Sequence, residues 1–419
     1  MLRRPVRAAD RVVRLTVATY PRAMSGVDLG RQAHELARTH DVVLAGGRPD
    51  RAPRAVVARS WERVLALGLD PDRSHVRDPR DAAELARRRS VSPLRLVVDD
   101  LRAVLTSTAD ASQFVMVVCD ADGVLLWREG SARVLRQADR LGFAEGATWT
   151  EGAVGTNAIG TALAEATAVQ LFSAEHFEHQ QHPWYCTAAP LHDPRTGELL
   201  GVVDVSGPAL TLHPALAALV ASAVRVAEHQ LWRRHQDDLH RLRSSVEGSL
   251  GRGGPLLVVD DHGWVAHRAG VDAGRDRIAA PREHQPLAVP GLGLCLPVRL
   301  PGGWLVRPQG AATRLEAELV HLDGGRQPGL RVRTGAGSGP AESWTRPLTP
   351  RHAELLRLLD AAGPAGLGAR ELSVALHGDA DHEVAVRAEV SRLRRAVGAL
   401  VATRPYRLAD GVTLHDRTR

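Results

Sequence analysis

The most distinctive chemistry in this sequence lies in residues 148–163, TWTEGAVGTNAIGTAL. The stretch contains three glycines, one acid (Glu151) and one amide (Asn157), and it lacks arginine in an arginine-rich chain. Glycines at this spacing permit backbone bends that other residues resist, and short hydroxyls and an amide beside such a backbone offer hydrogen-bond donors and acceptors. The pattern favours a loop and a short helix, residues 157–164, that form one wall of a small pocket. A tight turn with helix caps explains the same composition without a ligand.

We predict that this pocket binds a small-molecule effector. Trp149 supplies an apolar wall, Asn157 a polar anchor, and Asp204 lies near the floor. The predicted ligand-binding residues are Trp149, Glu151, Thr156, Asn157, Thr161, Cys186 and Asp204.

Three histidines, His176, His179 and His182, precede Cys186 at spacings that are compatible with a zinc or haem site. Only one cysteine lies nearby, and the intervening glutamines and proline are typical of a solvated loop, so we predict no metal and no cofactor. A nucleophilic Cys186 lacks a fixed acid partner, and a redox role for Cys119 or Cys186 competes with inert packing in strands. We predict no catalytic residue, and the protein is not expected to be an enzyme.

A second candidate site is a cluster of arginines near the carboxyl end. Residues 387–407 contain six arginines and one acid, a net charge of +5. The chain contains no lysine, so arginine serves wherever a fixed positive charge is needed. The clustering of arginines is therefore more informative about DNA binding than their number. Arginine binds both phosphates and guanine edges, whereas a solvated helix face is the alternative. The predicted DNA-binding residues are Arg387, Ser391, Arg392, Arg394, Arg395, Arg404 and Arg407.

The elements that position the first site are predicted from hydrophobic patterning. Apolar runs at 114–119 and 124–127, separated by an Asp-Gly turn, predict an edge hairpin, and 199–205 predicts a central strand. Further strands are predicted at 168–173 and 187–190, and helices at 27–40, 54–69 and 91–106. Antiparallel strands with helices on one face make an α+β domain.

Residues 214–246 predict one long helix, whose second half extends beyond a compact domain. Packing on its own sheet accounts for the first half, and a two-chain coiled coil is our hypothesis for the second. Residues 255–345 predict a small β-rich module, similar to a PAS domain at its start.

The C-terminal segment predicts three helices, 351–362, 369–377 and 381–400, with Val384 and Val390 among the inward residues of the third. Residues 404–408 and 412–414, on either side of Asp410-Gly411, predict a hairpin. Three helices and a hairpin are the elements of a winged helix-turn-helix. By spacing, Arg387, Arg394 and Arg395 share one outward helix face with Ser391.

Four ordered motifs add a family resemblance over about residues 91–231. GTNAIGTAL, EHF, WYCTAAPLHD and LLGVVDVSG together resemble the GAF sensor domain of actinobacterial regulators and the sensor of acetoin-type activators of transcription. The leader SWER followed by GLDP accompanies the sensor in that family, which implies packing against the sensor or a second subunit.

The C-terminal helices resemble winged-helix output domains, which implies that residues 387–395 enter the major groove and 404–407 contact the backbone. Acetoin-type activators carry an ATPase module, but this chain has no G-x-x-x-x-G-K-[ST] phosphate loop. We therefore expect direct promoter binding without ATP-driven remodelling.

Length and composition bound these predictions. A chain of 419 residues accommodates two or three domains, and no apolar run is long enough to span a membrane. Three scattered cysteines and the lack of an apolar signal segment favour a reduced, cytoplasmic protein. The predicted fold is a multidomain α+β chain. Its segments are a helical leader (1–90), a GAF-like sensor (91–231), a helical connector (214–250), a β-rich module (255–345) and a winged helix (346–419).

The predicted function is a homodimeric one-component regulator whose sensor binds a small molecule and whose winged helix binds double-stranded DNA. The alternative is a signalling module with a ligand-free dimerisation domain and a C-terminal domain that contacts protein.

Overall fold

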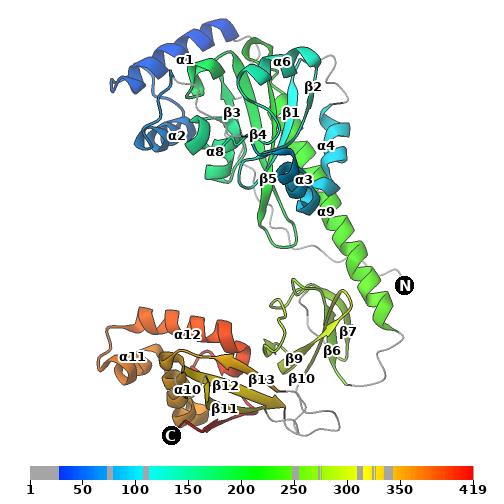
Figure 1. Cartoon of the computed structure of the whole chain (residues 1–419), viewed down its shortest axis with the longest axis vertical. Coiled ribbons are helices and arrows are strands. Elements are labelled where there is room, and N and C mark those ends of the chain that lie inside the picture. Colours follow the sequence, from blue (N-terminus) through cyan, green and yellow to red (C-terminus); the bar gives the residue numbers. More distant parts are fainter. Residues whose placement is uncertain are drawn as a thin grey trace. The chain divides into compact units, whose positions relative to one another are not determined.

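The computed structural model describes residues 28–72, 79–106, 113–247, 254–271, 274, 276–308, 315–322, 325, 327–334 and 343–418. The arginine-rich start of the predicted leader, residues 1–27, lies outside this set. The chain divides into two compact units, Met1–His235 and Gln236–Arg419, and each is described by itself (Figure 1). Among the described residues, no helix is both long and apolar enough to cross a bilayer.

The first unit is built on a five-stranded antiparallel sheet with the order β2-β1-β5-β4-β3 (Figure 1). Its strands are β1 (Val115–Asp120), β2 (Leu125–Gly130), β3 (Val169–Phe172), β4 (Trp184–His192) and β5 (Leu199–Pro208). The predicted edge hairpin and central strand are both confirmed. Along β1, Met116 and Val118 face one core, whereas Val115 and Val117 face the other. Because both faces are buried, this strand is apolar throughout rather than alternating.

Helices cover both faces of this sheet, so the prediction of helices on one face only is wrong. One core includes Leu101 and Val220, and the opposite core includes Val57, Trp61 and Ile159. The sequence before the sensor supplies part of this second layer, because its apolar stripe packs on the sheet. The helices are α1 (Leu29–Leu44), α2 (Ala55–Ala66), α3 (Ala82–Val91), η1 (Pro93–Leu96), α4 (Val98–Leu105), α6 (Ala132–Arg140), α7 (Glu151–Val154), α8 (Ala158–Glu165), η2 (Ser173–Glu175), η3 (His179–Gln181), η4 (Ala209–Thr211) and α9 (Leu216–Glu247).

Residues 91–106, predicted as one helix, are instead split. Helix α3 ends at Val91, the 3-10 turn η1 begins at Pro93, and α4 follows. Proline lacks a backbone N–H and disfavours helical geometry at the residue before it, here Ser92. The Ser92 side chain accepts a hydrogen bond from the Leu94 amide, which starts the new turn.

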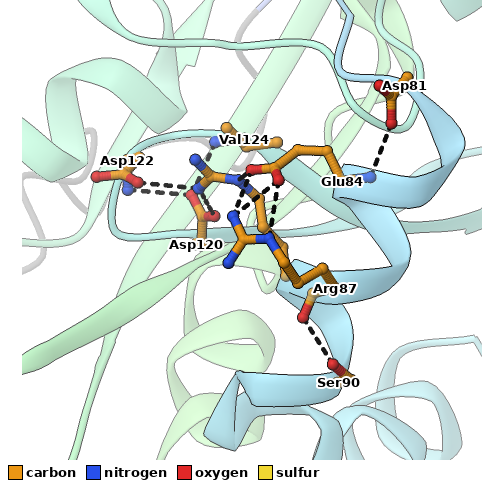
Figure 2. A network of polar contacts seen from close by, with 8 residues as sticks. Asp81, Glu84, Arg87, Ser90, Asp120, Asp122 and Val124 are labelled. Atoms are coloured by element: carbon orange, nitrogen blue, oxygen red, sulfur yellow. Dashed lines mark hydrogen bonds and ion pairs between the residues drawn. The ribbon is translucent and has the colours of Figure 1, made fainter.

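A polar cluster fixes α3 to the turn between β1 and β2 (Figure 2). The Arg88 guanidinium donates to Asp120 at 2.7 Å, to Asp122 at 2.9 Å and to Glu84 at 2.8 Å. Within the turn, Asp120 also accepts from the Val124 amide at 3.0 Å. One arginine thereby joins a helix to a hairpin more than thirty positions further along the chain.

The predicted long helix is α9, and its two halves pack in different cores. Val220 and Val224 belong to a core of the first unit. Leu242 and Val246 pack with β-strand residues of the second unit in a separate small core. These last two positions, which the coiled-coil hypothesis would use, are therefore covered within a single chain.

The second unit begins with a five-stranded sheet of order β7-β6-β10-β9-β8. Numbered in chain order, these strands follow the same 2-1-5-4-3 order as the sheet of the first unit. Its strands are β6 (Leu256–Val259), β7 (Val265–Ala269), β8 (Leu287–Val289), β9 (Gly293–Leu300) and β10 (Gly303–Pro308).

The rest of the second unit combines a sheet of order β13-β12-β11-β16 with three helices. One core joins Leu319 and Leu330 of the sheet to Leu355 and Leu393 of the helices, so this core crosses the boundary expected near residue 345. The elements are β11 (Leu315–Leu322), β12 (Gln327–Thr334), β13 (Ser343–Pro347), α10 (Pro350–Ala362), η6 (Gly363–Ala365), α11 (Ala369–His377), α12 (Glu383–Val397), η7 (Gly398–Leu400), β14 (Val401–Ala402), β15 (Arg407–Leu408) and β16 (Val412–Asp416).

Two local predictions in this segment are wrong. The strands on either side of Asp410-Gly411 do not pair with each other: β15 pairs with β14, and β16 lies parallel to β11. Leu414 belongs to the core of the sheet, which explains why β11 rather than β15 binds this strand. Val384, predicted inward, is 77% exposed because it lies in the first turn of α12, before the helix reaches the core.

Candidate functional site

A pocket opens in the first unit between α6, α8 and the paired strands β4 and β5. Its space not filled by atoms is about 330 Å³, part of which is open to solvent. Its apolar walls are Leu141, Phe143, Trp149, Ala158, Ile159 and Trp184. Its polar lining residues are Asn157, Gln181, Cys186, Asp204 and Ser206. Four of the seven residues predicted to bind ligand, Trp149, Asn157, Cys186 and Asp204, therefore line one cavity.

Asp204 is the most unusual polar group of the pocket. It lies on the central strand β5 and is 1% exposed. Ser206 donates a hydrogen bond to its Oδ2 at 2.5 Å, whereas its Oδ1 has no hydrogen-bond partner among the described residues. Burial raises the pKa of this carboxyl to about 7. Since buried polar atoms are normally paired, Oδ1 is suited to accept a hydrogen bond from a bound molecule.

Cys186 faces the same cavity as a neutral thiol. Burial, and then the nearby Asp204 carboxyl, raise the pKa of Cys186 well above its ordinary value. Burial likewise raises the pKa of Cys119, whose Sγ contacts the Val202 carbonyl at 3.5 Å. A reactive cysteine requires a lowered pKa, so the geometry gives no support to a nucleophilic or redox thiol at either position.

Asn157 shapes the pocket wall with both ends of its side chain. Its Oδ1 accepts from the Gly160 amide at 2.9 Å, which caps α8, and its Nδ2 donates to the Gly155 carbonyl at 2.9 Å. Gly155 has φ +74°, and a Cβ at Gly160 would lie 2.5 Å from the Glu151 amide nitrogen. The predicted need for glycine in this stretch therefore has two causes, backbone conformation and close packing of α8 on α7.

The other three predicted residues, Glu151, Thr156 and Thr161, hold the pocket wall to α2 and do not line the cavity. The Ser60 hydroxyl lies 2.5 Å from Glu151 Oε1 and 2.7 Å from the Thr156 hydroxyl, and it lies 3.2 Å from the Thr161 hydroxyl. Arg63 donates to both Glu151 oxygens, at 2.7 and 2.8 Å. Glu151 is thereby a buried, paired carboxylate, as a structural role requires.

Several lining residues were missed by sequence reasoning. The sequence did contain a signal for Ser206 and Trp184. Side chains two positions apart on a strand point to the same face, so Ser206 shares a face with Asp204, and Trp184 shares one with Cys186. Leu141 and Gln181 carried none, since their approach to the pocket depends on how distant loops pack.

The histidines and Cys186 considered as a metal site in the sequence do not assemble as a group. His176 is fully buried, with Nδ1 2.8 Å from the Ser173 carbonyl, and Cys186 lies in the pocket. His179 and His182 instead approach His40 of α1, with one ring nitrogen from each of the three within 4.8 Å of the others.

The C-terminal arginines differ in exposure and pairing. Arg387 pairs with Glu383 at 2.6 Å, Arg392 with Glu389, and Arg407 with Asp410 at 2.5 Å. With Glu383 and Asp410 included, residues 383–410 contain six arginines and three acids, a net charge of +3.

The remaining arginines do not share one environment. Arg394 turns inward and donates to the Val401 carbonyl at 3.0 Å, so its predicted place on the outward face is wrong. Arg395 and Arg404 are exposed and make no ion pair with any residue that the structure describes. The exposed face of α12 therefore carries Arg387, Ser391 and Arg395, with Val384 at its start.

The chain is similar to known regulators of transcription. Residues 33–229 match the family model described as the N-terminal domain of MimR. An uncharacterized 47.3 kDa protein in the thcA 5' region of Rhodococcus erythropolis is 32% identical over 396 residues, covering 93% of this chain and 72% of that protein. AcoR, the acetoin dehydrogenase operon transcriptional activator of Bacillus subtilis, is 34% identical over 180 residues, covering 42% of this chain and 29% of AcoR. MimR, the propane 2-monooxygenase operon transcriptional activator of Mycolicibacterium smegmatis, is 31% identical over 238 residues, covering 53% of this chain and 39% of MimR.

These named relatives are regulators of transcription and not enzymes. The chain spans 29% of the length of AcoR and 39% of that of MimR. The matches support a regulator with a sensor-type N-terminal domain.

Proposed function

We propose that this chain, which belongs to the family of the Rhodococcus erythropolis protein, is a one-component transcriptional regulator that binds a small molecule in its first unit and promoter DNA through its second. In this proposal the first unit is a GAF-like sensor, and the strand order shared by the two five-stranded sheets supports a PAS-like origin for the middle module. Helices α10–α12 with the β14–β15 hairpin act as a winged helix, and the protein acts as a homodimer.

The observation that carries the sensor proposal is the unpaired Oδ1 of Asp204 at a mostly apolar pocket. A carboxyl with a pKa of about 7 accepts a hydrogen bond when ionised, and it donates one when protonated. We infer that the effector is small and largely apolar, with one hydroxyl or protonated amine directed at this oxygen. Trp149 and Trp184 would then enclose its apolar part.

A thermal-shift screen of small alcohols, diols and amines tests the sensor directly. A hit should raise the melting temperature of the full-length protein, and the effect should be lost in Asp204→Asn. Thr187→Val is the matched control, because Thr187 is a buried polar residue of the neighbouring strand β4 that does not line the pocket. An equal increase of the melting temperature in the parent and in Asp204→Asn would show that Asp204 does not bind the effector.

The DNA-binding proposal is supported by the exposed face of α12. Arg387 and Arg395 can reach phosphates or base edges, and the exposed apolar Val384 is suited to contact a thymine methyl group. Arg404 lies in the turn between β14 and β15. In a winged helix this turn is the wing, which contacts the phosphate backbone of DNA. Phosphate contacts supply affinity at all sequences, whereas base-edge contacts supply preference.

Fluorescence anisotropy with the chain's own upstream DNA, repeated at rising salt, separates these roles. Arg395→Ala should weaken binding to all sequences and lower the slope of log K against log salt by about 1. Val384→Ser should weaken binding to the operator while binding to unrelated DNA stays unchanged. The control is Arg136→Ala, an exposed arginine on α6 of the first unit. Binding that is insensitive to salt and to Arg395 would refute DNA contact by this face.

A further inference from the structure

We propose that His40, His179 and His182 form a binding site for a zinc-type divalent cation that joins α1 to the η3 turn. His40 lies on α1, whereas His179 begins η3 and His182 directly follows it. The chain brings the three rings together from positions more than 130 residues apart. Their ring centroids lie 4.7 to 5.0 Å apart.

In two of the three rings, one nitrogen lies within hydrogen-bonding distance of an oxygen. His40 Nε2 lies 3.0 Å from the Phe177 carbonyl, and His179 Nδ1 lies 3.0 Å from Asp72 Oδ1. Histidines that ligate metals characteristically donate the N–H of the other nitrogen to a carbonyl or carboxylate, which fixes the tautomer. The second nitrogen of each of these two rings is then left with a lone pair.

The second nitrogen of His40 is in a position that a cation would satisfy. A carbonyl accepts hydrogen bonds and cannot donate, so the Phe177 contact requires the His40 proton on Nε2. Nδ1 then presents a lone pair to the Asp41 carboxylate, whose Oδ1 lies 3.2 Å away. Neither atom can donate to the other. A second proton on the ring would also resolve this, and a bound metal ion would take the place of that proton.

The other two rings support the same conclusion. His182 Nε2 is buried and has no hydrogen-bond partner in the part of the chain that the structure describes. His179 Nε2 lies 3.5 Å from the same Asp41 oxygen that faces His40. Neutral rings with unshared lone pairs are the form in which histidine binds metal.

Asp41 lies at the ligand spacing of a small tetrahedral ion, and the three histidine nitrogens must move closer together to reach that spacing. Zinc–nitrogen and zinc–oxygen bonds of about 2.0–2.1 Å place neighbouring ligands of a tetrahedron roughly 3.4 Å apart. The distances from Asp41 Oδ1 to His40 and to His179 are 3.2 and 3.5 Å, and the three histidine nitrogens lie within 4.8 Å of one another. Three imidazoles and a carboxylate favour zinc over magnesium or calcium, which prefer oxygen ligands alone.

Such an ion would restrain one wall of the pocket. Gln181 lies between His179 and His182 in the sequence, and its side chain lines the cavity. Cation binding would therefore fix η3 against α1 and hold Gln181 in place. The site needs neither the effector nor DNA, so its test is independent of the proposed function.

The test is zinc binding to the full-length protein after dialysis against a chelator, measured by competition with a chromophoric chelator. We expect one zinc per chain. His179→Ala and His182→Asn should each weaken binding at least about tenfold. His179 is exposed, so its variant should fold, and circular dichroism verifies this. His229→Ala, an exposed histidine of α9, is the matched control and should bind zinc as the parent does.

Cobalt substitution supplies a second readout of the ligand geometry. Cobalt in a site of three imidazoles and one oxygen should give the intense visible absorption of a tetrahedral ion. The proposal would be overturned by a protein that binds no zinc, by equal affinity in the parent and both variants, or by a weak octahedral cobalt spectrum.

Discussion

Replacing Asp204 with asparagine should stabilise the first unit at neutral and alkaline pH. Among the described residues, the buried carboxyl accepts one hydrogen bond, from Ser206, and its second oxygen is unpaired. Asparagine has nearly the same shape and carries no charge, so it avoids the cost of burying a carboxylate. Loss of the effector response should accompany this gain, as is common when a functional polar group is removed from a core.

The size of the effect follows from the pKa of Asp204. Burial raises this pKa from an ordinary 3.8 to about 7. Because the folded state holds the proton more tightly, the residue has no cost near pH 3, where it is protonated in both states. The cost grows as the pH rises towards about 7 and is complete above it. At roughly 1.4 kcal/mol per pKa unit, the full cost is up to about 4 kcal/mol, of which about 3 kcal/mol should develop between about pH 5 and pH 8.

Urea unfolding of parent and variant at a series of pH values measures this difference. Both proteins contain the same second unit, so the difference between them reports the substituted site. Asp99→Asn is the control, since this carboxyl is 85% exposed and has no burial cost for the substitution to relieve. A stability difference for Asp204→Asn that is flat between pH 5 and pH 8 would refute the argument that burial of this carboxyl is costly.

The remaining predictions concern the scaffold of the pocket, and urea unfolding measures each of them. Ser60→Ala should destabilise the first unit by about 1–3 kcal/mol, because it removes a hydroxyl in hydrogen-bond contact with buried Glu151. Gly155→Ala should cost at least about 1–3 kcal/mol, since it combines φ +74° with a Cβ only 2.5 Å from the Phe177 ring; an unchanged midpoint would show that the loop can rearrange. Arg88→Met should cost about 1 kcal/mol, and this loss should shrink at high salt, which screens the ion pairs to the β1–β2 turn.

The fold of the first unit could be predicted where local pattern decides the structure. Apolar runs between turn residues identified β1, β2 and β5, and the cap formed by Asn157 followed from its place before a helix. The split at Pro93 could also have been read from the sequence, because proline restricts the residue before it. Coverage of both sheet faces was missed, although the uninterrupted apolar pattern of β1 implied it.

The sequence predicted which residues gather around the candidate site. It did not predict which of them line the cavity and which hold the pocket wall to α2. Glu151, Thr156 and Thr161 carry the polar groups expected of a ligand site, yet they bind Ser60, which lies 91 to 101 residues away in the sequence. Nothing local distinguishes a threonine that faces a cavity from one that faces a helix packed behind it. The same holds for Arg394, whose position on α12 permits either solvent or the Val401 carbonyl.

The central strand offers a direct route from the pocket to the rest of the chain. Asp204 faces the cavity, whereas its neighbours Val203 and Val205 face the opposite core, which contains Val220 and Val224 of α9. A molecule that binds Asp204 changes the charge and hydrogen bonding of β5 at the residue between these two contacts. Because α9 continues without interruption to Glu247, a shift of β5 would act on this helix under the proposed function. A ligand can bias output only through different affinity for two arrangements, so substitution of Val205 should alter the coupling between effector and DNA while leaving effector affinity nearly unchanged.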